Sequence, residues 1–161
     1  MDGRGRNGIL IRVCAAAAVA AALLAAPAHA DSADDGALLN QINATRTANG
    51  CLPVAANPQL RAAAARQAND MLANGVVSHV GSDGSSVGQR ITDAGYARYA
   101  DIGEIIFWSA GVGAVPAAAV NWWMNSPGHR AIITDCDMTE AGVAVIRSGA
   151  RAAAVGEFGR K

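Results

Sequence analysis

Apolar residues recur at helical spacing in several segments of the chain. Between residues 38 and 48 they repeat every three to four positions, and Asn49-Gly50 then supplies residues that tolerate a left-handed backbone. Asn57 followed by Pro58 marks the start of a second helix, which we expect to run to Asn74 before Gly75. Shorter helices are predicted over residues 87–94, 116–124 and 129–133.

Three segments favour strands. Residues 101–108 are rich in Ile, Phe and Trp, and residues 141–147 and 152–158 are alternating or continuously apolar. Ser148-Gly149 lies between the last two segments and predicts a hairpin. The pattern therefore predicts an α+β domain in which helices flank a small antiparallel sheet.

The first 30 residues have the pattern of a secretory signal. An apolar, alanine-rich run over residues 13–26 precedes small residues at Ala28 and Ala30, where a signal peptidase would cut. An uncleaved membrane anchor is the alternative, although the run is marginal for spanning a bilayer. We expect residues 31–36 to be a flexible entry and residues 37–161 to form one domain. The head of the signal carries three positive charges, at Arg4, Arg6 and Arg12.

The charge of the chain argues against nucleic acid as a partner. The whole chain has 13 basic and 13 acidic residues. Loss of residues 1–30 removes three arginines and one aspartate, which leaves a slightly acidic chain without a basic patch. Nucleic-acid binding is therefore not expected, and contact with a membrane is expected only during export.

Cys51 and Cys136 are the two cysteines that remain after cleavage at Ala30. In an oxidising exported setting an even pair predicts one disulfide, whereas two free buried thiols are the alternative. The pair lacks CxxC spacing, so redox catalysis or a zinc knuckle is not indicated.

His79, His129 and Glu104 are the candidate chemical residues of the mature chain. Each histidine lies in a turn-rich loop, where an ordinary surface residue is the alternative reading. Glu104 lies in an apolar strand segment, where it needs a partner if it is buried, although strand alternation would equally place it on a solvent-facing side. Two imidazoles and one carboxylate form a competent set for a divalent transition metal.

Common catalytic motifs are missing. The sequence contains neither an HExxH helix nor a G-x-S-x-G elbow, and no local signature singles out a serine nucleophile. Trp108, Trp122 and Trp123 are expected in the core and in the wall of a groove rather than in a carbohydrate platform.

The most specific motif is Trp123-Met-Asn-Ser-Pro-Gly-His-Arg130. With the other motifs, in their order, it resembles the bacterial form of the CAP superfamily: the cysteine-rich secretory, venom-allergen and plant pathogenesis-related proteins. The resemblance covers about residues 37–159, and the high alanine content suits a GC-rich, actinobacterial source. The other motifs are Asn43/Arg46, Asn57–Leu60, Ser78-His79, Asp83–Ser86, Arg90, Ala94–Tyr96, Gly103–Ile105, Glu140–Val143 and Phe158-Gly159.

This resemblance implies an α-β-α sandwich with a three-stranded antiparallel sheet between helical layers. It also implies that His79, Glu104 and His129 meet in a cleft, where many members bind a divalent cation such as zinc or magnesium. Asn125 and Ser126, which we expect to shape the same cleft, stand where many members carry a second acidic residue. We therefore expect weaker metal binding, or a cleft for an anion or another polar ligand without metal.

The resemblance implies a secreted, monomeric binding or interaction protein, extracellular or associated with the cell envelope. Its expected ligand is a small molecule, a lipid, a cell-envelope component or a divalent cation. The alternative is a metal-assisted hydrolase acting outside the cell or at the cell wall, in which zinc activates water and Glu104 serves as base.

Overall fold

The computed structural model describes Met1 and residues 33–111 and 115–161, so residues 2–30 of the predicted export signal lie outside the described residues. The described helices are α1 (Ala33–Ala48), α2 (Pro58–Asn74), α3 (Val87–Asp93), α4 (Val115–Met124) and α5 (Pro127–Ile133). The strands are β1 (Ala55–Ala56), β2 (Asp101–Ala110), β3 (Glu140–Ser148) and β4 (Arg151–Arg160).

The three long strands form the predicted antiparallel sheet, in the order β3-β4-β2. Gly149 turns the β3–β4 hairpin with a φ of 60°. The prediction of three strands was wrong by one, because β1 adds a short parallel strand beside β3. The N–H groups of Ala55 and Asn57 donate to the carbonyls of Thr139 and Ala141. Two alanines carry no strand pattern, and only the proximity of β3 makes them a strand.

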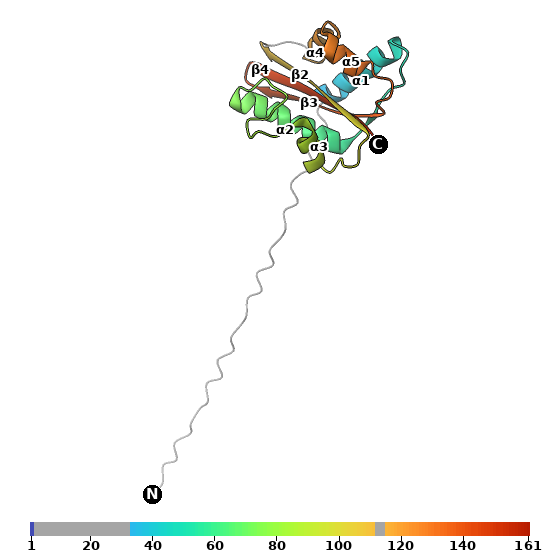
Figure 1. The fold of residues 1–161 in the computed structure, drawn as a ribbon. Helices are drawn as coiled ribbons and strands as arrows, with labels where there is room; N and C mark the ends of the chain where they lie inside the picture. Colours follow the sequence, from blue (N-terminus) through green and yellow to red (C-terminus); the bar gives the residue numbers. More distant parts are fainter. Residues whose placement is uncertain (2–32, 112–114) are drawn as a thin grey trace.

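Helices cover both faces of the sheet, as the α-β-α prediction required. Helices α2 and α3 lie on one face, and α1, α4 and α5 lie on the other (Figure 1). Because side chains alternate along β2, Ile105 packs with Trp123 in the α1/α4/α5 cluster, whereas Ile106 packs with Met71 of α2.

Residues 33–36, expected to be part of a flexible entry, form the first turn of α1. Asp35 anchors this turn to two other elements. Its Oδ1 accepts the Val145 N–H of β3 at 2.8 Å, and its Oδ2 pairs with Arg61 of α2 at 2.6 Å. The prediction was wrong because these partners lie far away in the sequence.

Cys51 and Cys136 form the predicted disulfide, with Cα atoms 4.8 Å apart. Nearby, the fully buried Arg46 donates to the carbonyls of Leu52, Ile133, Asp135 and Met138. These contacts join the end of α1 to the segment that follows α5. Within residues 33–111 and 115–161, no helix has the length and apolar character needed to cross a membrane.

Candidate functional site

A cleft of about 570 Å³ lies beside β2. Among the described strands, the sheet order places β2 at an edge, with β4 on one side only. The loop after α2 borders the cleft from one helical layer, and α4 and α5 border it from the other. The lining residues are Val77, Ser78, His79, Ile106, Phe107, Trp108, Trp122 and His129.

Glu104 holds His79 at the rim of the cleft. Its Oε1 lies 2.7 Å from His79 Nδ1, and its Oε2 lies 2.6 Å from Arg90 Nη2. The side chains of Glu104 and Arg90 are each 1% exposed, whereas that of His79 is 52% exposed. Glu104 therefore faces protein, and the solvent-facing alternative that strand alternation left open does not hold.

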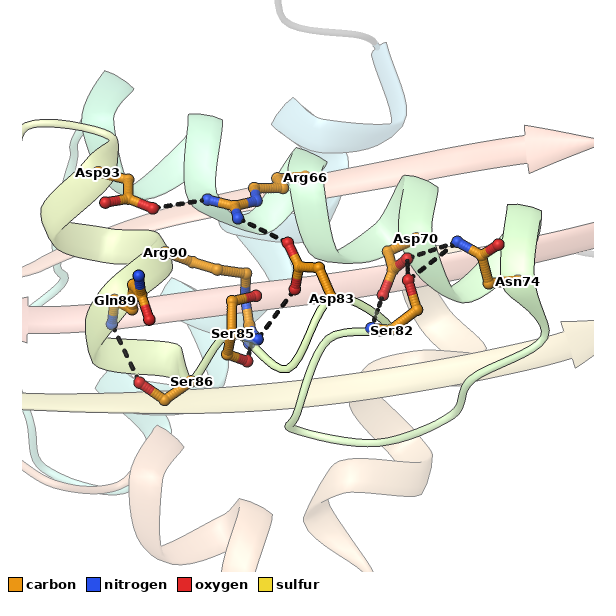
Figure 2. Close-up of polar contacts among 10 residues, drawn as sticks. All are labelled: Arg66, Asp70, Asn74, Ser82, Asp83, Ser85, Ser86, Gln89, Arg90 and Asp93. Carbon is orange, nitrogen blue, oxygen red and sulfur yellow. Dashed lines mark hydrogen bonds and ion pairs between the residues drawn. The ribbon is translucent and has the colours of Figure 1, made fainter.

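Arg90 reaches Glu104 from α3 because a polar loop holds that helix in place. Arg90 Nη1 donates to the Ser85 carbonyl at 2.8 Å, and Asp83 Oδ1 accepts the Ser85 N–H at 2.9 Å. Arg66 of α2 then pairs with Asp83 and with Asp93, each at 2.9 Å, so it ties the loop and α3 to α2 (Figure 2). His79 thus depends on contacts that run back to α2.

The Glu104–His79 contact favours the charged form of both groups. Burial by itself raises the pKa of the Glu104 carboxyl, but the hydrogen bond with His79 and the charge of Arg90 outweigh it and lower the pKa. The same hydrogen bond raises the pKa of the His79 imidazole against the opposing effect of burial. The ionised form of Glu104 is therefore favoured, and its carboxylate lies between the Arg90 guanidinium and the His79 imidazole.

Glu157 is a second carboxyl group at this place, and it was not predicted from the sequence. It lies directly opposite Glu104 on β4 and is 0% exposed. Among the described residues, no group other than the Glu104 carboxylate is placed to hydrogen-bond its carboxyl group. Burial, followed by the charge of Glu104, raises the pKa of Glu157 well above its ordinary value, so the neutral form of Glu157 is favoured. A charged residue inside an apolar strand segment is the signal that could have identified Glu157, and the same signal identified Glu104.

His129 enters the cleft from the first turn of α5. Ser126 is the N-cap of this helix, but its side chain makes no capping bond. Its Oγ lies instead 2.8 Å from His129 Nδ1, which orients the ring. Burial, together with the charge of His79, lowers the pKa of His129, so its neutral form is favoured. The His129 Nε2 atom is buried and has no hydrogen-bond partner among the described residues.

Some of the predicted site residues come together and others do not. The ring centroids of His79 and His129 are 6.3 Å apart across the cleft, and Glu104 contacts His79. Ser126 acts through His129, whereas Asn125 is exposed, donates to the Asn121 carbonyl and does not line the cleft.

The predicted metal ligands fit a cation only in part. Both Glu104 oxygens are already engaged by His79 and Arg90, which leaves the two imidazole Nε2 atoms as the free donors. In the part of the chain that the structure describes, no three His, Cys, Asp or Glu side chains are grouped so that they could hold a metal ion. Imidazole suits zinc, whereas magnesium prefers oxygen ligands.

Aromatic residues form the apolar wall of the cleft, and two of the three tryptophans predicted for the core and a groove wall lie in this wall. Trp122 is 48% exposed, and its ring centroid lies 4.9 Å from that of His129 and 6.1 Å from that of Phe107. Trp108 is 40% exposed. Trp123 is fully buried and donates its indole N–H to the Ile106 carbonyl at 2.8 Å.

The fold and this site define an α-β-α sandwich with two histidines that face each other across a cleft at the sheet edge. The sequence model of the cysteine-rich secretory protein family (CAP) matches residues 39–158, and the chain belongs to this family. No curated protein matches the sequence.

Solved structures share the fold. An outer surface protein from Borrelia burgdorferi superposes with a TM-score of 0.70 at 22% identity, over 80% of this chain and 92% of that one. An extracellular protein containing a SCP domain from Bacillus anthracis str. Ames gives 0.70 at 24% identity, over 80% of this chain but only 40% of its own. NaASP2 with Zn2+ gives 0.62 at 15% identity, over 83% of each chain.

Proposed function

We propose that this protein is an extracellular binding module, and that the cleft beside β2 takes a small organic ligand with an apolar body and an acidic head. The observation that carries this proposal is the buried Nε2 atom of His129, which lines the cleft without a hydrogen-bond partner among the described residues. A buried polar atom without a partner costs free energy, so a ligand that bonds to it gains that free energy on binding.

The lining of the cleft supports this choice of ligand. Its volume of about 570 Å³ suits a small molecule, and its wall of Ile106, Phe107, Trp108 and Trp122 suits an apolar body. The polar lining side chains among the described residues are Ser78 and the two histidines, so none of them is a carboxylate that would repel an acidic head. A fatty acid or an acidic cell-envelope component meets both requirements.

Zinc held by the two imidazoles is the alternative occupant, and NaASP2 is a structural neighbour that has been solved with Zn2+. The hydrolase alternative would need Glu104 as a free base. Both oxygens of this carboxylate are already bonded, so we propose binding rather than hydrolysis.

The proposed location is outside the cell or at its envelope, with the protein as a monomer. It rests on the predicted export signal and on two structural neighbours that are described as outer-surface and extracellular proteins. The disulfide suits the same oxidising setting.

Tryptophan fluorescence tests the proposal, because Trp108 and Trp122 line the cleft. The purified secreted protein is titrated with decanoate, with decanol and, separately, with zinc chloride. We expect decanoate to bind more tightly than decanol, and His129→Ala to weaken decanoate binding by about 10- to 100-fold through loss of a charge-assisted hydrogen bond.

The matched control is Leu52→Ala, which removes an apolar side chain that is 82% exposed and does not line the cleft. It should bind decanoate like the wild type. Equal losses in both variants, or no response to decanoate, would contradict the proposal. Tight zinc binding that disappears in both His79→Ala and His129→Ala would show that the cleft binds a cation and not an acidic ligand.

A further inference from the structure

The outer side of β2 is an open strand edge inside the cleft. The Gly111 N–H donates to the Ala150 carbonyl across the sheet. Because backbone direction alternates along an antiparallel strand, Phe107 then points its N–H and C=O toward β4, whereas Ile106 and Trp108 point theirs away from it. The bond from the Trp123 indole to the Ile106 carbonyl confirms this direction, since Trp123 lies outside the sheet.

Among the residues that the structure describes, other segments cover only parts of this edge. Asp101 bonds to the N–H of Ile102, and Trp123 bonds to the carbonyl of Ile106. Among the described residues, neither the N–H nor the C=O of Trp108 bonds to a segment on the outer side. This pair of backbone groups therefore opens into the cleft that Trp108 lines.

An open edge of this kind accepts another strand. Natural proteins usually shorten, charge or cover their edge strands, because unpaired backbone groups recruit other chains. Strand β2 is instead ten residues long, and the cleft beside it is walled by Phe107, Trp122 and Val77. Extended peptides bind to such edges through backbone bonds, and adjacent pockets take alternate side chains.

The two histidines lie at one end of the cleft, and they indicate which end of a bound peptide would lie beside them. The Trp123 bond to Ile106 ends the available edge near His79 and His129, so an added strand stops at this point. The buried Nε2 of His129 needs a partner, and the Glu104 carboxylate is already paired with Arg90. A terminal carboxylate fits this end by charge and by hydrogen bonding.

We propose that the cleft binds the C-terminal end of an extended peptide, which adds to β2 as an antiparallel strand and places its α-carboxylate between His79 and His129. The Trp108 N–H and C=O pair with the peptide backbone, and the aromatic wall takes an apolar side chain. This inference deepens the proposed function and rests on it, because it names the chemical class of the acidic ligand.

Acetylated pentapeptides that end in leucine or phenylalanine test the inference with the purified secreted protein. We expect the free carboxylate to bind at least about 10-fold more tightly than the C-terminal amide. N-methylation of the peptide nitrogen that faces the Trp108 carbonyl should weaken binding by about 5- to 10-fold, because it removes one backbone donor and leaves the protein unchanged.

Hydrogen exchange at the Trp108 amide separates strand addition from simple occupancy of the cleft. The peptide should slow exchange at this amide, whereas decanoate should not. If decanoate binds but the peptides neither bind nor protect Trp108, the inference is wrong and the proposed function stands. If neither binds, both fail. Protection of Trp108 that instead rises with protein concentration alone would identify a second copy of this chain as the occupant and overturn the inference.

Discussion

Glu104 and Glu157 show how surroundings decide the state of a residue. They lie opposite each other on β2 and β4, and both are buried. Two adjacent buried carboxylates cannot both ionise at low cost. Glu104 is paired with His79 and Arg90, which favours its charged form, whereas Glu157 forms no ion pair among the described residues and its neutral form is favoured.

Glu157→Gln should therefore preserve or raise the stability of the protein at neutral pH. The raised pKa means that the folded state keeps a proton that the unfolded chain releases above its ordinary pKa. The free energy of unfolding of the wild type then falls as the pH rises from the pKa of the unfolded chain toward the higher pKa of the folded state. The slope is about 1.4 kcal/mol per pH unit. The glutamine variant should lack this slope in urea unfolding measured from pH 5 to pH 8.

Glu104→Gln is the matched comparison on the facing strand. It leaves Arg90 buried without its counterion and should cost about 3–5 kcal/mol. Equal losses in the two variants at every pH would show that Glu157 is not neutral.

At the scale of elements, Gly142 sets how closely α2 approaches β3. A Cβ atom at this position would lie 1.9 Å from the backbone nitrogen of Arg61 and 2.3 Å from the carbonyl carbon of Leu60. No side chain can move aside there, because the neighbouring atoms belong to the helix backbone. The helix therefore packs directly on the strand, and only glycine fits.

Gly142→Ala should lower the free energy of unfolding by more than about 3 kcal/mol, at the upper end of overpacking costs. Gly36→Ala in α1 is the control, since a Cβ there meets nothing within 4 Å. It should raise stability by about 0.5–1 kcal/mol, because alanine is the better helix former. Thermal or urea unfolding measures both variants. A Gly142→Ala protein as stable as the wild type would show that α2 can shift away from the sheet.

At the scale of the whole molecule, the disulfide closes a loop with a sequence separation of 85, which includes α2, α3, β2, α4 and α5. The elements that border the cleft lie within this loop. A crosslink of this span restricts the unfolded chain far more than a local one would.

Replacing Cys51 and Cys136 together by serine should cost about 4–5 kcal/mol of stability by loop-closure entropy. Urea unfolding of the double variant measures this loss. Thiol titration of the unfolded, unreduced secreted protein should find no reactive thiol from this pair. Two reactive thiols, or a variant of unchanged stability, would be the contrary result.

Local signals in the sequence were sufficient to predict most of the helices and strands. Helix α2 was predicted from Pro58 to Asn74, where the structure has it, because its N-cap Asn57 and the left-handed Gly75 act within a few residues. The three long strands, the hairpin at Gly149 and the disulfide were predicted for similar reasons, as was the family. Such signals depend on neighbours along the chain, or on the count of cysteines left after cleavage.

Only the tertiary structure decided what surrounds each site residue. The alternation of β2 could not show that His79 and Arg90 enclose Glu104, because these partners come from a loop and from α3. The pairing of β1, the neutral Glu157 and the open outer edge of β2 likewise depend on segments distant in the sequence. The sequence by itself determined which residues carry chemistry, and long-range packing determined their charge, burial and free hydrogen-bonding groups.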